Sequence, residues 1–206
     1  MKTEILDMLS FLRENFDSFS ANLVPLWHPL GFVSCVIDEV SSSHIARVHY
    51  WPEGERRVKN PDWPIHTHTY RLHSLVLAGA VRDLQYRVQP GAGWCEYSVS
   101  YYSGGSEIVR TPNEVDTFVE VDELRLAGNC YEVPRGVYHQ TLVPHEQSAV
   151  TLVLLTDHSS DAPKVLGSKL AERYPYDRIS FDRERFWGVI KEALENQLTN
   201  AGKGRS

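Results

Sequence analysis

Gly128-Asn-Cys-Tyr-Glu-Val-Pro134-Arg-Gly136-Val-Tyr-His139 is a segment that places a tight turn between two short apolar runs. Pro134 presets its own backbone angle, and Gly136 adopts conformations that are closed to other residues, so the pair favours a turn. His139 begins the run that follows, and the turn therefore fixes the direction in which this histidine points. The segment predicts a strand, a turn and a second strand.

The same texture extends outward over residues 32–156. Short runs rich in Val, Ile, Tyr, Leu and Trp are separated by Gly, Pro, Asn and Asp, and in the run 94–101 every second side chain shares one face. Many short strands with evenly spaced turns predict an antiparallel sandwich or barrel, and no alternation of strands with helices is seen. The expected strands are 32–39, 45–51, 65–68, 73–78, 80–88, 94–102, 106–111, 115–121, 130–133, 138–143 and 149–156.

Helices are predicted on both sides of this β-region. Apolar residues recur at steps of three and four from Ile5 to Phe19, and again over 182–198, where Asp182 is placed to cap the helix. Residues 158–180 look loop-like, with a short helix as one option at 164–173. The expected all-β architecture is one domain over residues 1–206, with a helical segment at 1–31, a β-barrel core at 32–157 and a helical segment at 158–206.

The composition is that of an ordinary globular protein with an acidic surface. The chain has 206 residues, 42% hydrophobic and 23% charged, and a formal net charge of −6, which predicts no binding to nucleic acid or to an anionic membrane. Cys35, Cys95 and Cys130 are far apart and odd in number, so we expect reduced, buried thiols. No apolar stretch approaches the roughly 20 residues that span a bilayer. A cytoplasmic location is the expectation.

Two histidines stand two positions apart in Pro64-Ile65-His66-Thr67-His68. Side chains at positions i and i+2 of a strand project from one face, with their Cα atoms about 7 Å apart. Two imidazoles at that spacing can bind one metal ion. The alternative is a pair of surface or hydrogen-bonded histidines.

Together the two segments resemble the motifs of the cupin family. The family's second motif, G-x5-P-x-G-x2-H-x3-N, is matched at every spacing by Gly128, Pro134, Gly136 and His139. It departs only at its last position, where Val143 replaces the asparagine. The resemblance covers about residues 45–156.

The family's first motif, a HxH followed by a glutamate and then a glycine, is matched less closely. His66, His68 and Gly79 fit this frame, but His73 stands in the position of the glutamate. The resemblance implies an RmlC-like jelly-roll barrel, a double-stranded β-helix, with the metal inside one end. It carries the metal ligands over to His66, His68 and His139.

His73 is either a fourth ligand or a residue behind the ligands that contacts them or the substrate. On one straight strand His68 and His73 would face opposite ways, so His73 joins the site only if the chain turns at 69–72. A site of histidines alone is similar to those of cysteine dioxygenase-like cupins, which implies Fe(II), with Zn, Ni and Mn as alternatives. The Ser-His-Cys stretch associated with true cysteine dioxygenases is absent after His68.

Arg71 and Tyr70 are the candidate substrate-binding residues, because they follow the HxH directly and an arginine can grip a carboxylate with two hydrogen bonds. A solvated loop arginine is the alternative for Arg71. Tyr138 and Gln140 flank His139, so they should face away from the metal.

The resemblance implies an iron dioxygenase acting on a small organic substrate, such as a thiol-bearing or carboxylic acid. A metal-dependent isomerase, decarboxylase or lyase is the second possibility, with Glu132 or a tyrosine as its acid or base. A non-catalytic module that binds a metal or a small ligand is the third. A homodimer is expected because open sandwiches have strand edges to protect.

Overall fold

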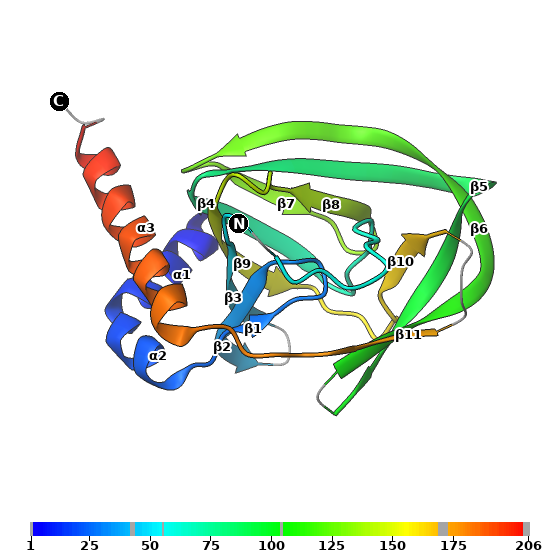
Figure 1. The fold of residues 1–206 in the computed structure, drawn as a ribbon. Coiled ribbons are helices and arrows are strands. Elements are labelled where there is room, and N and C mark those ends of the chain that lie inside the picture. The colour runs from blue at the N-terminus through cyan, green and yellow to red at the C-terminus, as the bar shows by residue number, and fades with distance from the viewer. Residues whose placement is uncertain (1, 42–43, 55, 104, 169–172, 204–206) are drawn as a thin grey trace.

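The computed structural model describes residues 2–41, 44–54, 56–103, 105–168 and 173–203, and it contains two antiparallel sheets with helices packed on one side (Figure 1). The strands of the first sheet are, in spatial order, β1 (Leu26–Trp27), β2 (Val33–Ser41), β3 (His44–Trp51), β9 (Ala149–Thr156), β4 (Arg71–Ala78) and β7 (Cys130–Val133). The second sheet contains, in spatial order, β10 (Lys164–Gly167), β5 (Ala80–Tyr102), β6 (Gly105–Leu126) and β11 (Arg173–Asp177), and β8 (Tyr138–Leu142) pairs with β5. The predicted jelly-roll fold with flanking helices is confirmed.

The helices cover the outer face of the first sheet (Figure 1). They are α1 (Lys2–Glu14), α2 (Phe16–Asn22) and α3 (Arg183–Lys203). Asp182 caps α3 as predicted, because its Oδ1 accepts a hydrogen bond from the Arg185 N–H at 2.8 Å. The buried face of α3, which includes Phe186 and Ile190, packs on the sheet. None of the helices in the described residues is both long enough and apolar enough to cross a membrane.

Strand β3 shows how this arrangement sorts side chains. Its residues Ala46, Val48 and Tyr50 lie in the core cluster between the first sheet and the helices. Arg47 and His49 alternate with them and therefore face the space between the two sheets, where they line a cavity. The interior of the β-sandwich thus receives charged and titratable side chains from a central strand.

Several predicted elements differ from the observed ones. Residues 80–102 form one long strand, because the glycine-rich stretch 91–93 lies at a register shift between β5 and β6 and does not end the strand. Residues 164–167 form β10, so the option of a helix at 164–173 is wrong there, and 169–172 lie outside the described residues. Period-two pairing with β5 overrides the weak local helical pattern.

Candidate metal centre

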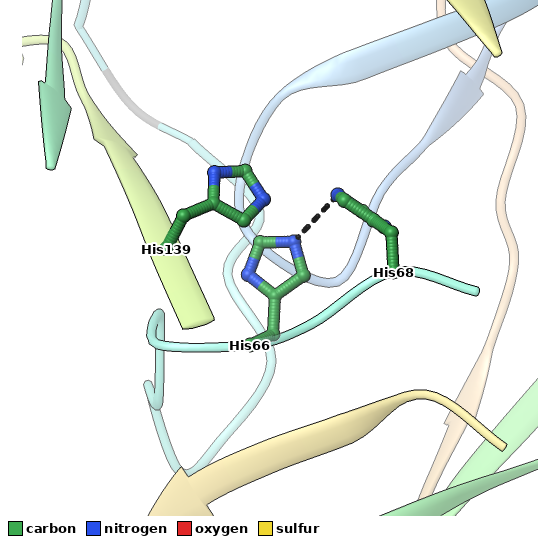
Figure 2. A group of neighbouring side chains, drawn as sticks. All are labelled: His66, His68 and His139. Atoms are coloured by element: carbon green, nitrogen blue, oxygen red, sulfur yellow. Dashed lines mark hydrogen bonds between the residues drawn. The ribbon is translucent and has the colours of Figure 1, made fainter. Parts of the chain in front are cut away.

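Three histidines from two distant segments come together between the sheets. One ring nitrogen each of His66, His68 and His139 lies within 4.8 Å of the others, and Figure 2 shows the three rings turned toward a common point. The Nε2 atoms of His66 and His68 are 3.2 Å apart. The structure thus brings together the three histidines to which the cupin resemblance points.

Backbone hydrogen bonds explain why these segments meet. His66 and His139 form an isolated antiparallel bridge in which each N–H donates to the carbonyl of the other, at 3.0 and 2.8 Å. The Gly136 N–H donates to the His68 carbonyl at 3.0 Å. Gly136 has a φ of 77°, which a residue with a side chain adopts only at a cost. The turn before β8 is therefore bonded directly to the histidine pair.

The donor set fits a divalent metal ion. At a metal–nitrogen distance of about 2.1 Å, neighbouring imidazole nitrogens stand about 3–3.5 Å apart, so the His66–His68 pair already has the required spacing. His139 is only 3% exposed, and both of its ring nitrogens are buried without a hydrogen-bond partner. Such orphaned buried nitrogens are costly unless a ligand completes them. A small movement of His139 toward the His66–His68 pair would complete a three-histidine site.

The electrostatics hold these imidazoles in the neutral form that binds metals. Burial lowers the pKa of His66, His68 and His139, and for His68 and His139 the neighbouring histidines lower it further. The Nδ1 of His66 lies 2.8 Å from the Pro64 carbonyl oxygen, to which it donates when Nδ1 carries the proton. That hydrogen bond leaves the Nε2 lone pair directed toward the other two rings.

The three histidines border a cavity with two adjoining parts. The inner part has a volume of about 60 Å³ and reaches between the sheets, and the outer part has a volume of about 340 Å³. Six residues line both parts: His28, Leu30, Arg47, His66, His68 and Tyr70. Two of the histidines therefore lie at the junction, where a bound ligand can reach the metal position.

His73 lies outside this histidine group. Its Nε2 is 3.1 Å from the Thr156 hydroxyl, and its Nδ1 is 3.4 Å from a carboxylate oxygen of Glu132. Tyr70 and Leu72 face the cavity, and His73, one position later on β4, faces the opposite side of the sheet. Its predicted role as a fourth ligand therefore has no support in this geometry.

The two candidate substrate-binding residues separate in the structure. Tyr70 lines both parts of the cavity and stacks on His68, with ring centroids 4.7 Å apart. Burial raises the pKa of Tyr70 to about 12, so its phenol stays protonated. Arg71 does not line the cavity and forms an ion pair with Glu132 instead. This pair also holds the predicted acid–base candidate Glu132 away from the histidines.

Three cavity residues were not predicted as site residues from the sequence. Arg47 and His49 come from β3, and His28 comes from the segment after β1. Burial lowers the pKa of His49 to about 3, and Arg47 contributes to that shift. A signal existed in 44–51, where polar residues alternate with Ala46, Val48 and Tyr50. The alternation alone does not tell which face lines the interior.

Comparison with known proteins finds distant similarity to solved structures. No protein-family model matches the sequence, and no curated protein matches it. One similar structure is an RmlC-like cupin from Shewanella frigidimarina, at 13% identity over 66% of this chain and 86% of that chain, with a TM-score of 0.37. A DMSP lyase from Ruegeria pomeroyi is 17% identical over 75% of this chain and 66% of that chain, with a TM-score of 0.42.

A third similar structure is the hydroxypropylphosphonic acid epoxidase from S. wedmorenis. It is 12% identical over 66% of this chain, with a TM-score of 0.39, and the match spans 56% of the epoxidase chain. The activities named for the lyase and the epoxidase are those of the two proteins themselves.

Proposed function

We propose that the protein binds one divalent metal ion through His66, His68 and His139 and acts as an Fe(II)-dependent dioxygenase on a small organic substrate. The observation that carries this proposal is the convergence of three imidazoles on the wall of the cavity, one of them with both ring nitrogens lacking a hydrogen-bond partner. An Fe(II) ion held by three protein ligands supplies vacant positions for a substrate donor and for dioxygen.

The residues around the three histidines bear on which reaction class the cavity suits. Leu72, Val153 and Leu155 supply an apolar portion of the lining of the inner part of the cavity. Tyr70 packs against the face of His68 and limits the rotation of that ring. No Asp or Glu among the described residues lines either part, so the cavity offers no carboxylate as a general base. This lining favours a dioxygenase over an enzyme that depends on proton abstraction by a carboxylate.

A metal-dependent lyase or isomerase is the second candidate, and Tyr70 is the observation that favours it. Its phenol borders both parts of the cavity and stays protonated, so it can donate a proton to a substrate held beside His68. Such a reaction consumes no oxygen. Oxygen uptake therefore separates the two candidates.

The first experiment is elemental analysis of the untagged protein beside His66→Ala and His139→Ala. We expect near-stoichiometric iron in the wild type after loading under anaerobic conditions. Each variant should lose the metal, with affinity reduced more than about 100-fold, because a ligand matters more than the residues behind it. His145→Ala is the matched control, since His145 is exposed and outside the histidine group.

The loaded protein is then screened in an oxygen electrode with small thiols and small carboxylic acids. Oxygen uptake that requires both the iron and His139 supports the dioxygenase. Product formation without oxygen uptake favours the lyase or isomerase. A wild type that takes up no Fe, Mn, Ni or Zn contradicts the metal site itself.

A further inference from the structure

The charges lining the cavity are all of one sign among the described residues. The outer part is bordered by Arg47, Lys59, Lys164 and Arg178, and no described Asp or Glu borders either part. Two of these charges are partly compensated: Lys164 forms an ion pair of 3.0 Å with Glu96, and Glu107 acts electrostatically on Lys59. A cationic cavity that no described acidic residue lines concentrates anions, although the whole chain carries a net charge of −6.

Arg47 has the most enclosed position of these cations. It is the only one of the four that also lines the inner part, and it does so beside His66 and His68. Burial lowers the pKa of His28 and His49, and the charge of Arg47 contributes to both shifts. Because Arg47 lines both parts of the cavity together with His66 and His68, it borders the space that a substrate beside the metal position would occupy.

The Nε of Arg47 is buried without a hydrogen-bond partner. A guanidinium is normally paired when it leaves water, because burial of an unpaired donor carries a cost. Other arginines near the barrel pair with a carboxylate: Arg71 pairs with Glu132, and Arg125, whose Nε is also buried without a partner, pairs with Asp83 through a terminal nitrogen. An arginine that lacks this pairing at a cavity wall is a binding group for an anion that enters from solution.

The walls beyond Arg47 determine what else the ligand contains. Apolar and aromatic side chains dominate the outer part, among them Trp27, Val36, Trp63, Val99 and Ile108. A volume of about 340 Å³ suits a small organic molecule rather than a polymer end or a free inorganic ion. The ligand therefore combines an anionic group with an apolar body.

We propose that Arg47 binds the carboxylate of a small organic acid whose apolar body occupies the outer cavity next to His66 and His68. This proposal names the substrate class of the function proposed above and rests on it for the reaction, but not for the binding. Arg47 takes the role that the sequence had suggested for Arg71. The planar guanidinium supplies paired hydrogen bonds to the two carboxylate oxygens.

The proposal also has a consequence for the stability of the ligand-free protein. Because Arg47 has a buried donor without a partner, replacing it with an uncharged residue should not destabilise the ligand-free protein. We expect Arg47→Gln to melt at the same or a higher temperature than the wild type. A merely structural arginine would give a lower melting temperature.

Titration calorimetry with 3-phenylpropanoate, and with 3-phenyl-1-propanol as its uncharged match, tests the proposal on the full chain. Metal-free and zinc-loaded forms are compared. We expect Arg47→Gln to weaken binding of 3-phenylpropanoate about 10- to 100-fold and to leave the alcohol unchanged, as loss of a charge-assisted hydrogen bond predicts. Arg47→Lys should give an intermediate loss of affinity for 3-phenylpropanoate, because lysine keeps the positive charge but cannot form the two parallel hydrogen bonds of a guanidinium.

Arg71→Gln is the matched control and should leave the affinity within about two-fold, because Arg71 lies outside the cavity. Equal binding of the acid by wild type and Arg47→Gln overturns the proposal. Inorganic phosphate that displaces 3-phenylpropanoate at lower concentration overturns the assignment of a carboxylate.

Metal content separates this proposal from the proposed function. If the wild type binds no metal while binding of 3-phenylpropanoate still depends on Arg47, the proposed metal site is wrong and the proposed carboxylate site stands. If the wild type binds metal and binding of 3-phenylpropanoate does not depend on Arg47, the proposed carboxylate site is wrong and the proposed metal site stands.

Discussion

At the scale of single residues, a histidine's position relative to the sheet decides its role. His139 lies at the start of β8, forms the bridge to His66 and has both ring nitrogens without a hydrogen-bond partner, so one of them is available to a metal ion. His73 lies on the other side of β4 and contacts Thr156 and Glu132. Both histidines are buried, but only His139 lies on the face of the sheet that borders the metal position.

His73→Gln should therefore keep the metal. We expect unchanged metal stoichiometry and a stability loss of about 1 kcal/mol, because the contact with the Thr156 hydroxyl is lost. Elemental analysis and urea unfolding measure the two quantities on the same sample. Loss of the metal with full stability would reverse this assignment and restore His73 as a ligand.

At the scale of secondary-structure elements, the turn between β7 and β8 is the link between sequence motif and site. Gly136 holds a φ of 77° and donates its N–H to the His68 carbonyl, so the turn positions the first histidine pair as well as His139. An added Cβ at Gly136 meets nothing within 4 Å, which leaves the backbone angle as the reason for glycine.

Gly136→Ala should lower stability by about 1–2 kcal/mol and weaken metal binding, because the strained turn shifts the histidines it anchors. Gly128→Ala is a matched control. Gly128 also has a positive φ, of 88°, and open space around its Cβ, but it lies in the turn before β7. We expect a similar stability loss with normal metal affinity, measured by unfolding and by competition with a chelator. Equal metal loss in both variants would contradict a specific role for Gly136.

The long strand β6 is an element whose far half has an open edge. In the described chain its residues after 109 pair with β5 alone, and Phe118, Val119, Leu124 and Leu126 are exposed there. An apolar edge of this kind favours association. The homodimer expected from the sequence stays a prediction that sedimentation velocity can test.

At the scale of the whole molecule, buried histidines inside the barrel make the stability of the fold depend on pH. Burial lowers the pKa of His49 to about 3 and that of His28 well below its usual value. Below pH 6.5 the unfolded chain binds more protons at these positions than the folded chain does. Stability contributed by the neutral rings is therefore complete above about pH 6.5 and is lost as the pH falls toward 3.

Chelator-treated protein should accordingly lose stability between pH 7.5 and pH 5. His49→Gln should reduce that loss by about 1–2 kcal/mol, since its shift alone predicts a difference of this size. Urea unfolding at the two pH values gives the comparison, and the metal-free state keeps metal release out of it. An identical pH dependence in the variant would show that His49 is not held neutral by the fold.

The sequence by itself determined the β-class, the flanking helices and the turn that leads into His139. These features are local, because period-two and period-3.6 patterns and turn residues act over a few positions. The sequence motifs also pointed to His66, His68 and His139, because the spacings within the turn and within the HxH pair can be read directly from the sequence.

Only the tertiary structure decided which faces of the strands line the interior. Alternation along 44–51 and along β4 divides side chains into two sets, pairing of β3, β4 and β9 aligns these sets across the sheet, and the helices cover one of the two faces. That choice places Arg47 in the cavity and removes His73 and Arg71 from it. The physical reason is that a strand's own sequence fixes which residues share a face, whereas the packing of the helices on one side of the sheet fixes which face is inside.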